Sequence, residues 1–367
     1  MSEQTKPDVI LDTVNQEVQS GQYSKALEGM GRSLDLNPKL EIVLYGALLI
    51  VAAAMRLWDL DSRAMHHDES LHAIYSWYVN IGNGYRHDPL MHGPFQFFGT
   101  SSIFALFGDT NVTVRLLPAL FGTVLVGLPY FLRNFMGRPG AMIVAAVLAI
   151  SPTMLYFSRF ARNDIFMAVW TLALVGVVWR YMDEKQPKWL YAAAVLMALG
   201  FATKESQFIV VALVGLGLVA LSWKELGEWI WGQRYLDEFS SSGILVIVLG
   251  TMTLPMLGAF SGIFQDTFGI ILTAPEHTPG LATGEADGIG VVSAIIITGV
   301  LTALAFAIIF KWNLKIGLIL MAIFWVITFL LFTSLGTNLI GITSGVWQSL
   351  GYWIGQQDVR RGSQPWY

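Results

Sequence analysis

The chain has 367 residues and a formal net charge of −4; 54% of its residues are apolar and only 13% are charged. Soluble globular domains carry about 25% charged residues, and a chain of this length cannot bury so much apolar surface in water, which excludes a soluble protein. The acidic balance argues against a nucleic-acid partner, and the absence of cysteine excludes disulfides and thiolate metal sites.

The first 39 residues are polar and contain two amphipathic stretches, around Val9–Val18 and Tyr23–Leu34. Together they resemble one tetratricopeptide-type helical hairpin, although a single unit cannot bury its own apolar face. A partly ordered cytoplasmic tail is the simpler interpretation. The tail contains no basic-then-apolar signal sequence, so we expect the first span to direct membrane insertion without cleavage.

Long apolar runs separated by short polar turns follow from residue 40 onward. Their length of roughly 17–21 residues fits membrane-spanning helices and not the alternating strands of outer-membrane barrels. The sequence therefore predicts an all-α integral membrane protein. About nine transmembrane helices are expected, at 40–57, 114–133, 139–157, 164–181, 189–203, 206–222, 243–260, 291–310 and 314–333.

The apolar segment Pro94–Phe107 is too short to cross the bilayer comfortably. With a cytoplasmic N-terminus, more lysine and arginine residues lie on the cytoplasmic side if this segment is interfacial than if it spans the membrane. The positive-inside rule therefore favours an interfacial helix. The transmembrane domain, 40–333, then carries an outer loop, 58–113, with two interfacial helices. An outer C-terminal segment, 334–367, follows the last span. The polar stretches 58–93, 158–163, 204–205, 261–290 and 334–367 are all expected over one outer face, whereas Trp223–Phe239 is expected as an amphipathic helix in the interface.

The first outer loop concentrates titratable side chains in a chain that has few of them. Five of the six histidines lie between residues 66 and 92, together with Asp68, Glu69 and Asp88. Ionisable groups at a membrane are costly and tend to mark functional sites. The run from His66 to His72 opens a short helix that Gly82 and Gly84 end.

Three interpretations of Asp68-Glu69 compete. The pair can be a helix N-terminus, where carboxylates accept backbone N–H groups and complement the helix dipole. Glu69-x-x-His72 is also part of a metalloprotease helix, but Asp68 stands where that motif needs its first histidine ligand. The third interpretation is a catalytic carboxylate at the membrane surface.

The order of motifs in this region resembles the C-type glycosyltransferases, which include protein O-mannosyltransferases and the lipid A aminoarabinose transferase. The motifs are an acidic pair after the first span, the segment from His87 to Pro94 (His-Asp-Pro-Leu-Met-His-Gly-Pro), and Asn111 followed by Val114-Arg115-Leu116-Leu117-Pro118-Ala119-Leu120. The closest resemblance is to the flippase-activity-associated subfamily near surface-glycosylation genes. It covers roughly residues 40–205.

The resemblance implies a role for several residues. Asp68 matches the family's catalytic acid, with Glu69 beside it, and His92 stands where the aminoarabinose transferase has a lysine. The segment from Ser158 to Asp164 is similar to an Arg-Phe-Ala-Arg-x-Asp loop, which nominates Arg162 and Asp164. Ala202-Thr203-Lys204-Glu205 is similar to an Ala-Thr-Lys-Gly turn and nominates Lys204.

Transfer of a sugar from a polyprenyl phosphate would need such a residue set. The departing phosphate is already a stable anion, so one carboxylate that deprotonates or orients the acceptor suffices, and attack opposite the phosphate inverts configuration. Cations must stabilise the charge that develops on the phosphate. The candidates for this binding role are Arg162, Lys204, Arg159, Arg86, His92 and His72. The alternative is that these cations snorkel toward headgroups or form local ion pairs.

Cofactors and partners stay open at this level. His66, His67 and Asp88, with Asp61, are candidate ligands of a divalent metal, but the O-mannosyl-type relatives manage without one, and we expect no required cofactor. The oligosaccharyltransferase signature Trp-Trp-Asp-x-Gly is absent from the sequence, which counts against en bloc glycan transfer.

Members of the family usually have eleven or more spans. We therefore also consider half of a split enzyme completed by a second membrane chain, or a non-catalytic assembly subunit. A transporter would show discontinuous helices with charges at mid-membrane depth, and the sequence has none that is clear. The predicted location is the plasma membrane, with a cytoplasmic N-terminus and an exoplasmic active face.

Overall fold

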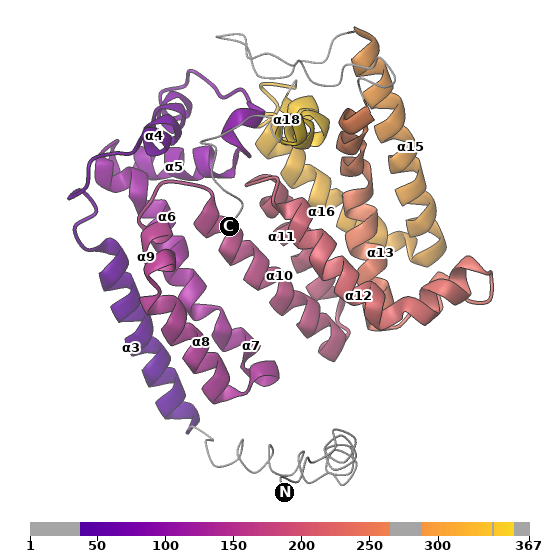
Figure 1. The fold of residues 1–367 in the computed structure, drawn as a ribbon, viewed down its shortest axis with the longest axis horizontal. Coiled ribbons are helices and arrows are strands. Elements are labelled where there is room, and N and C mark those ends of the chain that lie inside the picture. The colour runs from indigo at the N-terminus through magenta and orange to yellow at the C-terminus, as the bar shows by residue number, and fades with distance from the viewer. Residues whose placement is uncertain (1–36, 265–287, 340, 356–367) are drawn as a thin grey trace, which may run out of the picture.

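The structure is a computed structural model that describes residues 37–264, 288–339 and 341–355 (Figure 1). Throughout these ranges the regular secondary structure is helical, and the predicted all-α membrane fold is confirmed. Most of the predicted tail, 1–39, lies outside the described residues. So do 265–287 of the predicted outer segment 261–290 and the end of 334–367.

The described chain contains seven helices that are long and apolar enough to cross a membrane. They are Pro38–Leu57 (α3), Asn111–Met136 (α6 and α7), Asp164–Glu184 (α10), Gln207–Ile230 (α12), Ser241–Phe260 (α13 and the start of η3), Val292–Trp312 (in α15) and Leu314–Phe332 (α16). Within these spans the individual helices are α6 (Asn111–Gly127), α7 (Pro129–Met136), α13 (Ser241–Thr253), η3 (Leu254–Phe264) and α15 (Gly288–Trp312).

The two other predicted spans are helical but differ from simple crossings. The segment 139–157 is a pair, α8 (Arg138–Ile150) and α9 (Pro152–Ser158), bent by 61°. Pro152 causes the break, because proline lacks the N–H that would continue the ladder and restricts Ser151 before it. The segment 189–203 is α11 (Pro187–Phe201), which has only 15 residues. The described residues thus contain seven or eight helices of spanning length, and the predicted number of nine is not reached by this criterion.

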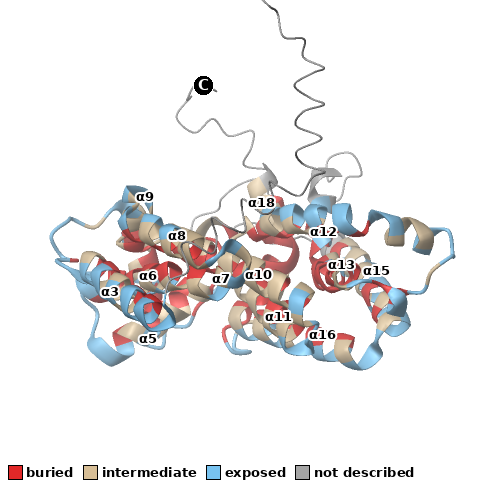
Figure 2. Ribbon diagram, turned by 90° about the horizontal axis from the view of Figure 1, so that it is seen from below, coloured by how far each residue is buried: buried red, intermediate tan, exposed pale blue. Residues whose placement is uncertain are grey.

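The helix α11 lies in the centre of the bundle, between α10 and α16 (Figure 1). Ala193, Ala194 and Ala198 on this helix are fully buried. Small side chains let helix backbones approach closely inside a membrane, where packing replaces the hydrophobic effect as the source of association. The buried residues accordingly follow the interior of the helical layer, and its outer faces are exposed (Figure 2).

The helix α3 shows how a span begins and how it presents its faces. Asn37 caps it by accepting from the Lys39 amide at 2.9 Å, and Pro38 occupies the first turn. Tyr45 and Ala52 pack toward α6 and α8, whereas Val43 and Ile50 are 64% and 72% exposed. An apolar exposed face of this kind belongs against lipid acyl chains.

Polar segments that are distant in sequence come together at one end of the bundle (Figure 1). Here lie α4 (His67–Asn80), the turn η1 (Pro89–Met91) and α5 (Phe95–Phe107). The chain after α16 returns to this end through α17 (Gly341–Thr343), a π-helical turn, η4 (Ser344–Gln348), and α18 (Ser349–Gly355), which packs on η1. The expected cluster therefore forms from 58–93, 158–163, 204–205 and the described part of 334–367.

The predicted amphipathic segment Trp223–Phe239 begins at a kink. Ser222 has a non-helical backbone inside α12, and the helix resumes to Ile230 before the short turn η2 (Leu236–Glu238). Trp231 and Tyr235 are 80% and 76% exposed. Exposed aromatic residues of this kind suit a headgroup interface.

Candidate functional site

The adjacent carboxylates Asp68 and Glu69 have different surroundings. His66, and not Asp68, is the N-cap of α4: its Nδ1 accepts from the Asp68 amide at 3.2 Å, and Glu69 Oε2 accepts from the His66 amide at 3.0 Å. The Glu69 side chain is fully buried, whereas that of Asp68 is 35% exposed. Only Asp68 of the pair is accessible to a ligand.

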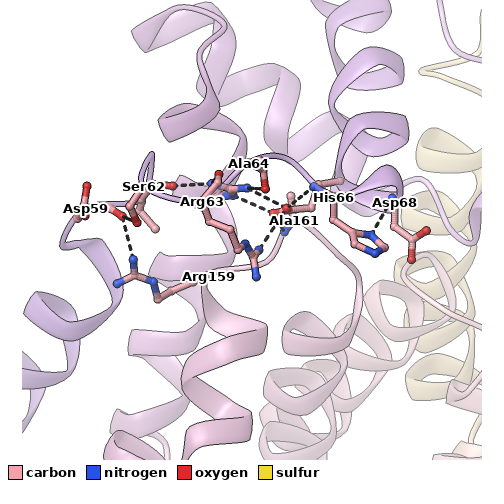
Figure 3. A network of polar contacts seen from close by, with 11 residues as sticks. Asp59, Ser62, Arg63, Ala64, His66, Asp68, Arg159 and Ala161 are labelled. Carbon is pink, nitrogen blue, oxygen red and sulfur yellow. Dashed lines mark hydrogen bonds and ion pairs between the residues drawn. The ribbon is translucent and has the colours of Figure 1, made fainter.

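Glu69 is held by a set of contacts that we call the Glu69 cluster: Glu69, Arg63, Arg115 and the Ala161 amide. Arg115 Nε and Nη2 donate to the two carboxylate oxygens at 2.8 and 2.9 Å, and the Ala161 amide donates to Oε1 at 3.1 Å. Burial alone would raise the pKa of the Glu69 carboxyl, but these donors outweigh it and hold the pKa below its usual value. The cluster joins α4, α6 and the turn after α9 (Figure 3).

Asp68 belongs to a second set, the Asp68 chain, made of Asp68, Arg162, Asp164 and Lys204. Arg162 Nη1 lies 2.9 Å from Asp68 Oδ2, and Arg162 Nε lies 3.5 Å from Asp164 Oδ2. Lys204 Nζ donates to Asp164 Oδ1 at 2.6 Å. Charges of alternating sign thus run from the start of α4, past the start of α10, to the turn between α11 and α12.

A pocket of about 280 Å³ opens beside Asp68, and we call it the Asp68 pocket. Its lining combines charged and imidazole side chains with apolar ones: His67, Asp68, Leu71, His72, Leu90, Met91, His92, Arg162 and Trp353. A concave site with a few convergent polar groups is the usual form of a ligand pocket.

His72 lines this pocket as a neutral group. Its side chain packs against Phe97 with ring centroids 5.2 Å apart, and its Nδ1 has no hydrogen-bond partner among the described residues. Burial, assisted by the positive charges nearby, lowers the pKa of His72 to about 3. His72 therefore presents a neutral imidazole to a ligand, whereas the sequence predicted it among the cations expected to bind phosphate.

His92 reaches the pocket because the backbone after it packs tightly on the turn after α11. The Gly93 amide donates to the Thr203 carbonyl at 3.1 Å, and the Phe95 amide donates to the Ala202 carbonyl at 2.8 Å. A Cβ atom at residue 93 would collide with that Ala202 carbonyl. Gly93 is thus required by close approach, and it brings His92 beside Glu205, with Nδ1 2.6 Å from Oε2.

Two of the predicted cations lie elsewhere. Arg159 donates to the carbonyls of Met55 and Asp59, both at 2.9 Å, and so completes the end of α3 on the side of the network away from Asp68 (Figure 3). Arg86 is exposed on the loop before η1 and is not among the pocket's lining residues.

The candidate metal ligands do not converge. His66 caps α4, His67 is exposed, and Asp88 accepts from the Leu90 amide at 2.9 Å to begin η1. Across residues 37–264, 288–339 and 341–355, no three His, Asp or Glu side chains are arranged to hold a metal ion. These residues therefore do not fit a resident metal, and no chemical step below depends on one.

Several residues of this region were missed or given another role by sequence reasoning. Arg115 lies in the motif that runs from Val114 to Leu120, but the sequence does not indicate that it binds Glu69. Ser349 and Trp353 come from α18, where no local pattern marks them, and they meet Glu205 and the η1 turn.

Comparison with known proteins bears on this arrangement. A model of the family described as dolichyl-phosphate-mannose-protein mannosyltransferase matches residues 91–249, a region that includes His92, Arg162, Asp164 and Lys204. The predicted resemblance to the C-type glycosyltransferases is confirmed, and the match supports a membrane glycosyltransferase of that type. No curated protein matches the sequence.

Two solved structures overlay on most of this chain. One is an Archaeoglobus fulgidus oligosaccharyltransferase tethered to an acceptor peptide, with a TM-score of 0.45, 14% identity and 83% of this chain covered. The other is the same enzyme with zinc and sulfate, with a TM-score of 0.42, 14% identity and 86% of this chain covered. The aligned part spans only 38% and 49% of the lengths of those two chains.

Proposed function

We propose that this chain transfers a sugar from a polyprenyl-phosphate donor to an acceptor, with inversion of configuration and with Asp68 as the base. The observation that supports this proposal is the Asp68 chain, whose members come from three separate segments. Asp68 and Arg162 form an ion pair and both line the Asp68 pocket, and Asp164 joins Arg162 to Lys204. The family match over 91–249 supports the glycosyltransferase class.

The two cations would act on the leaving group. As the glycosidic bond breaks, the electron pair goes to the phosphate oxygen and the lipid phosphate gains one negative charge. Preorganised cations stabilise charge that develops in this way. Arg162 offers a planar guanidinium suited to two phosphate oxygens, and Lys204 offers a point charge. Asp164, which contacts both cations, keeps them at a fixed spacing.

Asp68 would act on the acceptor. A carboxylate within hydrogen-bond distance of the acceptor's hydrogen takes that proton as the new bond to the anomeric carbon forms. Attack then comes from the face opposite the departing phosphate, so the product has inverted configuration. Glu69 has a different part in this proposal: with both oxygens occupied, it fixes the start of α4 and thereby the position of Asp68.

The cellular setting is part of the proposal. We place the pocket on the exoplasmic face of the plasma membrane, with the N-terminus in the cytoplasm and the lipid tail of the donor in the bilayer. A second membrane chain that completes the transferase is the partner we would test first.

Turnover measures this function directly. Purified full-length protein in lipid vesicles is offered a polyprenyl-phosphate sugar with acceptor, and released polyprenyl phosphate is counted. Asp68→Asn keeps the size of the side chain and removes its basicity, so release should fall by about 10²- to 10⁴-fold. Asp183→Asn is the matched control, because Asp183 is an exposed aspartate at the other end of α10, and it should release phosphate at the wild-type rate.

Two results would contradict the proposal. Release by Asp68→Asn at the wild-type rate would remove Asp68 from the reaction. Absence of release from the wild-type chain, with neighbouring membrane chains supplied, would instead support a non-catalytic assembly subunit with a transferase architecture.

A further inference from the structure

His92 has a strained backbone. Its φ of 63° and ψ of −158° lie in a region that only glycine normally occupies. A residue with a side chain is strained in this conformation, which persists only where the surroundings fix it firmly. Backbone strain of this kind concentrates at functional sites, so the contacts that hold His92 indicate what the residue is held for.

Helix α18 holds one face of the imidazole ring. The ring of His92 stacks on that of Trp353, with centroids 4.6 Å apart and planes inclined by 15°. Trp353 is itself fixed, because its Nε1 donates to the Pro89 carbonyl at 3.0 Å. The His92 amide donates to the same carbonyl at 3.2 Å. The plane of the His92 ring is therefore set by Trp353, which lies 264 positions after Pro89 in the chain.

Glu205 determines which ring nitrogen is available. Its Oε2 lies 2.6 Å from His92 Nδ1, and its Oε1 accepts from the Ser349 hydroxyl. The side chains of His92 and Glu205 are each only 10% exposed. Burial alone would raise the pKa of the Glu205 carboxyl, but the hydrogen bond and charge of His92 and the bond from Ser349 hold it below its usual value. An ionised carboxylate can only accept hydrogen bonds, so the Nδ1 of His92 must be the donor to Glu205.

With Nδ1 bound to Glu205, Nε2 is the nitrogen of His92 that can meet a ligand in the Asp68 pocket, which His92 lines. We propose that Glu205, supported by Ser349, is a positioning residue that stabilises His92 as an imidazolium whose Nε2–H donates to the phosphate of a polyprenyl-phosphate ligand. This inference rests on the proposed function for the identity of the ligand.

The other charged groups around His92 fit this assignment. Across the pocket are His67, Asp68, His72 and Arg162, of which Asp68 is paired with Arg162 and His72 is neutral. On its own loop are His87, kept neutral by burial that lowers its pKa to about 4, and Asp88, bonded to the Leu90 amide. Lys204, beside Glu205 in sequence, is bound to Asp164. Glu205 is therefore the carboxylate in direct contact with the ring.

Binding of a polyprenyl monophosphate to the full-length chain in nanodiscs tests the inference without acceptor or turnover. Glu205→Gln keeps the hydrogen-bonding shape and removes the charge, so affinity should fall about tenfold. His92→Gln should give a similar loss, and the double variant should bind no more weakly than His92→Gln alone, because Glu205 acts through His92. Ser349→Ala should weaken binding in the same direction by less.

Two further measurements separate positioning from a general loss of structure. Binding of the uncharged polyprenol should be the same in wild type and Glu205→Gln. In ¹⁵N-histidine spectra, the His92 resonance is identified as the one that disappears in His92→Gln. In the wild type this resonance should report a protonated, strongly hydrogen-bonded Nδ1, and it should shift in Glu205→Gln. Glu184→Gln is the matched control, because Glu184 is also an ion-paired carboxylate but lies at the far end of α10; it should change neither readout.

The inference would be overturned if the affinity losses of Glu205→Gln and His92→Gln multiplied in the double variant. It would also be overturned if Glu205→Gln weakened the binding of polyprenol as much as that of the polyprenyl monophosphate. If Glu205→Gln fails to fold, a double-mutant cycle of Ser349→Ala and His92→Gln tests whether the Glu205 side chain acts through His92. Phosphate binding that depends on Glu205 in a chain that releases no sugar would contradict the proposed function and leave this inference standing.

Discussion

The Glu69 cluster and the Asp68 chain begin at neighbouring residues and have opposite characters. In the Glu69 cluster, the carboxylate is fully buried and Arg115 is 1% exposed. In the Asp68 chain, Asp68 and Arg162 are each more than one-third exposed. Consecutive residues on a helix point about 100° apart, so one acidic pair supplies a side chain to the interior and another to the pocket.

This difference sets what each carboxylate can do. A buried ion pair has lost its hydration, so removing one partner leaves an uncompensated charge and is strongly destabilising. A partly exposed pair is screened by water and adds little to stability, but its groups can exchange partners with a ligand. Degree of burial therefore separates the residue that maintains the fold from the residue that can react.

The largest expected effect tests this separation through stability. Arg115→Met removes the buried guanidinium from Glu69 and leaves it only the partly exposed Arg63 of the cluster as a cationic partner, so it should lower the free energy of unfolding by about 3–5 kcal/mol. Arg162→Met removes the matching partner of Asp68 and should change it by no more than about 1 kcal/mol. Denaturant titration of both variants in detergent measures the two values; equal losses would contradict the comparison.

A smaller effect comes from two buried histidines, His72 in the Asp68 pocket and His87, which contacts Ser344. The pKa values of His72 and His87 fall to about 3 and 4 in the folded chain, below the ordinary value of about 6.5. Between pH 6.5 and 5 the unfolded chain binds protons that the folded chain does not. Each histidine should therefore lower stability by about 1.4 kcal/mol per pH unit as pH falls through this window.

Unfolding measured at pH 7.5 and pH 5 checks this dependence. The window stops at pH 5 because Glu69 and Glu205, whose pKa values are lowered, add their own dependence in stronger acid. His72→Gln should reduce the difference between the two pH values, whereas exposed His67→Gln should leave it unchanged. A difference unaffected by His72→Gln would show that this histidine is not buried as a neutral group.

The smallest expected effect concerns Arg159, whose guanidinium donates to the backbone carbonyls of Met55 and Asp59. Arg159→Gln should cost about 1 kcal/mol of stability and leave sugar transfer unchanged. Arg162→Gln, the same substitution in the Asp68 chain, should lower transfer and leave stability nearly unchanged. Measuring rate and unfolding for both variants would sharpen the comparison, and loss of transfer in Arg159→Gln would contradict it.

Much of the fold and part of the site follow from local sequence. Apolar run length predicted seven of the nine proposed spans as helices of spanning length, because each run must cover the same bilayer thickness. Gly82 and Gly84 correctly predicted that the helix from His67 would end near Asn80. The convergence expected of Asp68, Arg162 and Lys204 depended only on which membrane face each loop occupies, and the structure brings these residues together.

Side-chain direction and long-range contacts could not be read in this way. Sequence gives no means to tell that Glu69 points inward, that Arg159 turns back to α3, or that α11 needs only 15 residues in the bundle centre. Ser349 and Trp353 lie far from Glu205 and Pro89 in sequence, and no local periodicity links them.

The folding back of α18 has a consequence for biogenesis. Segments enter the membrane in the order in which the ribosome makes them, so His92 is synthesised and inserted long before Trp353 and Ser349 exist. A nascent chain stalled after α16 would hold its spans in the bilayer with an unsupported imidazole. Competence to bind lipid phosphate would thus arise only once α18 has been synthesised and has folded back onto η1, after the preceding helices have been delivered.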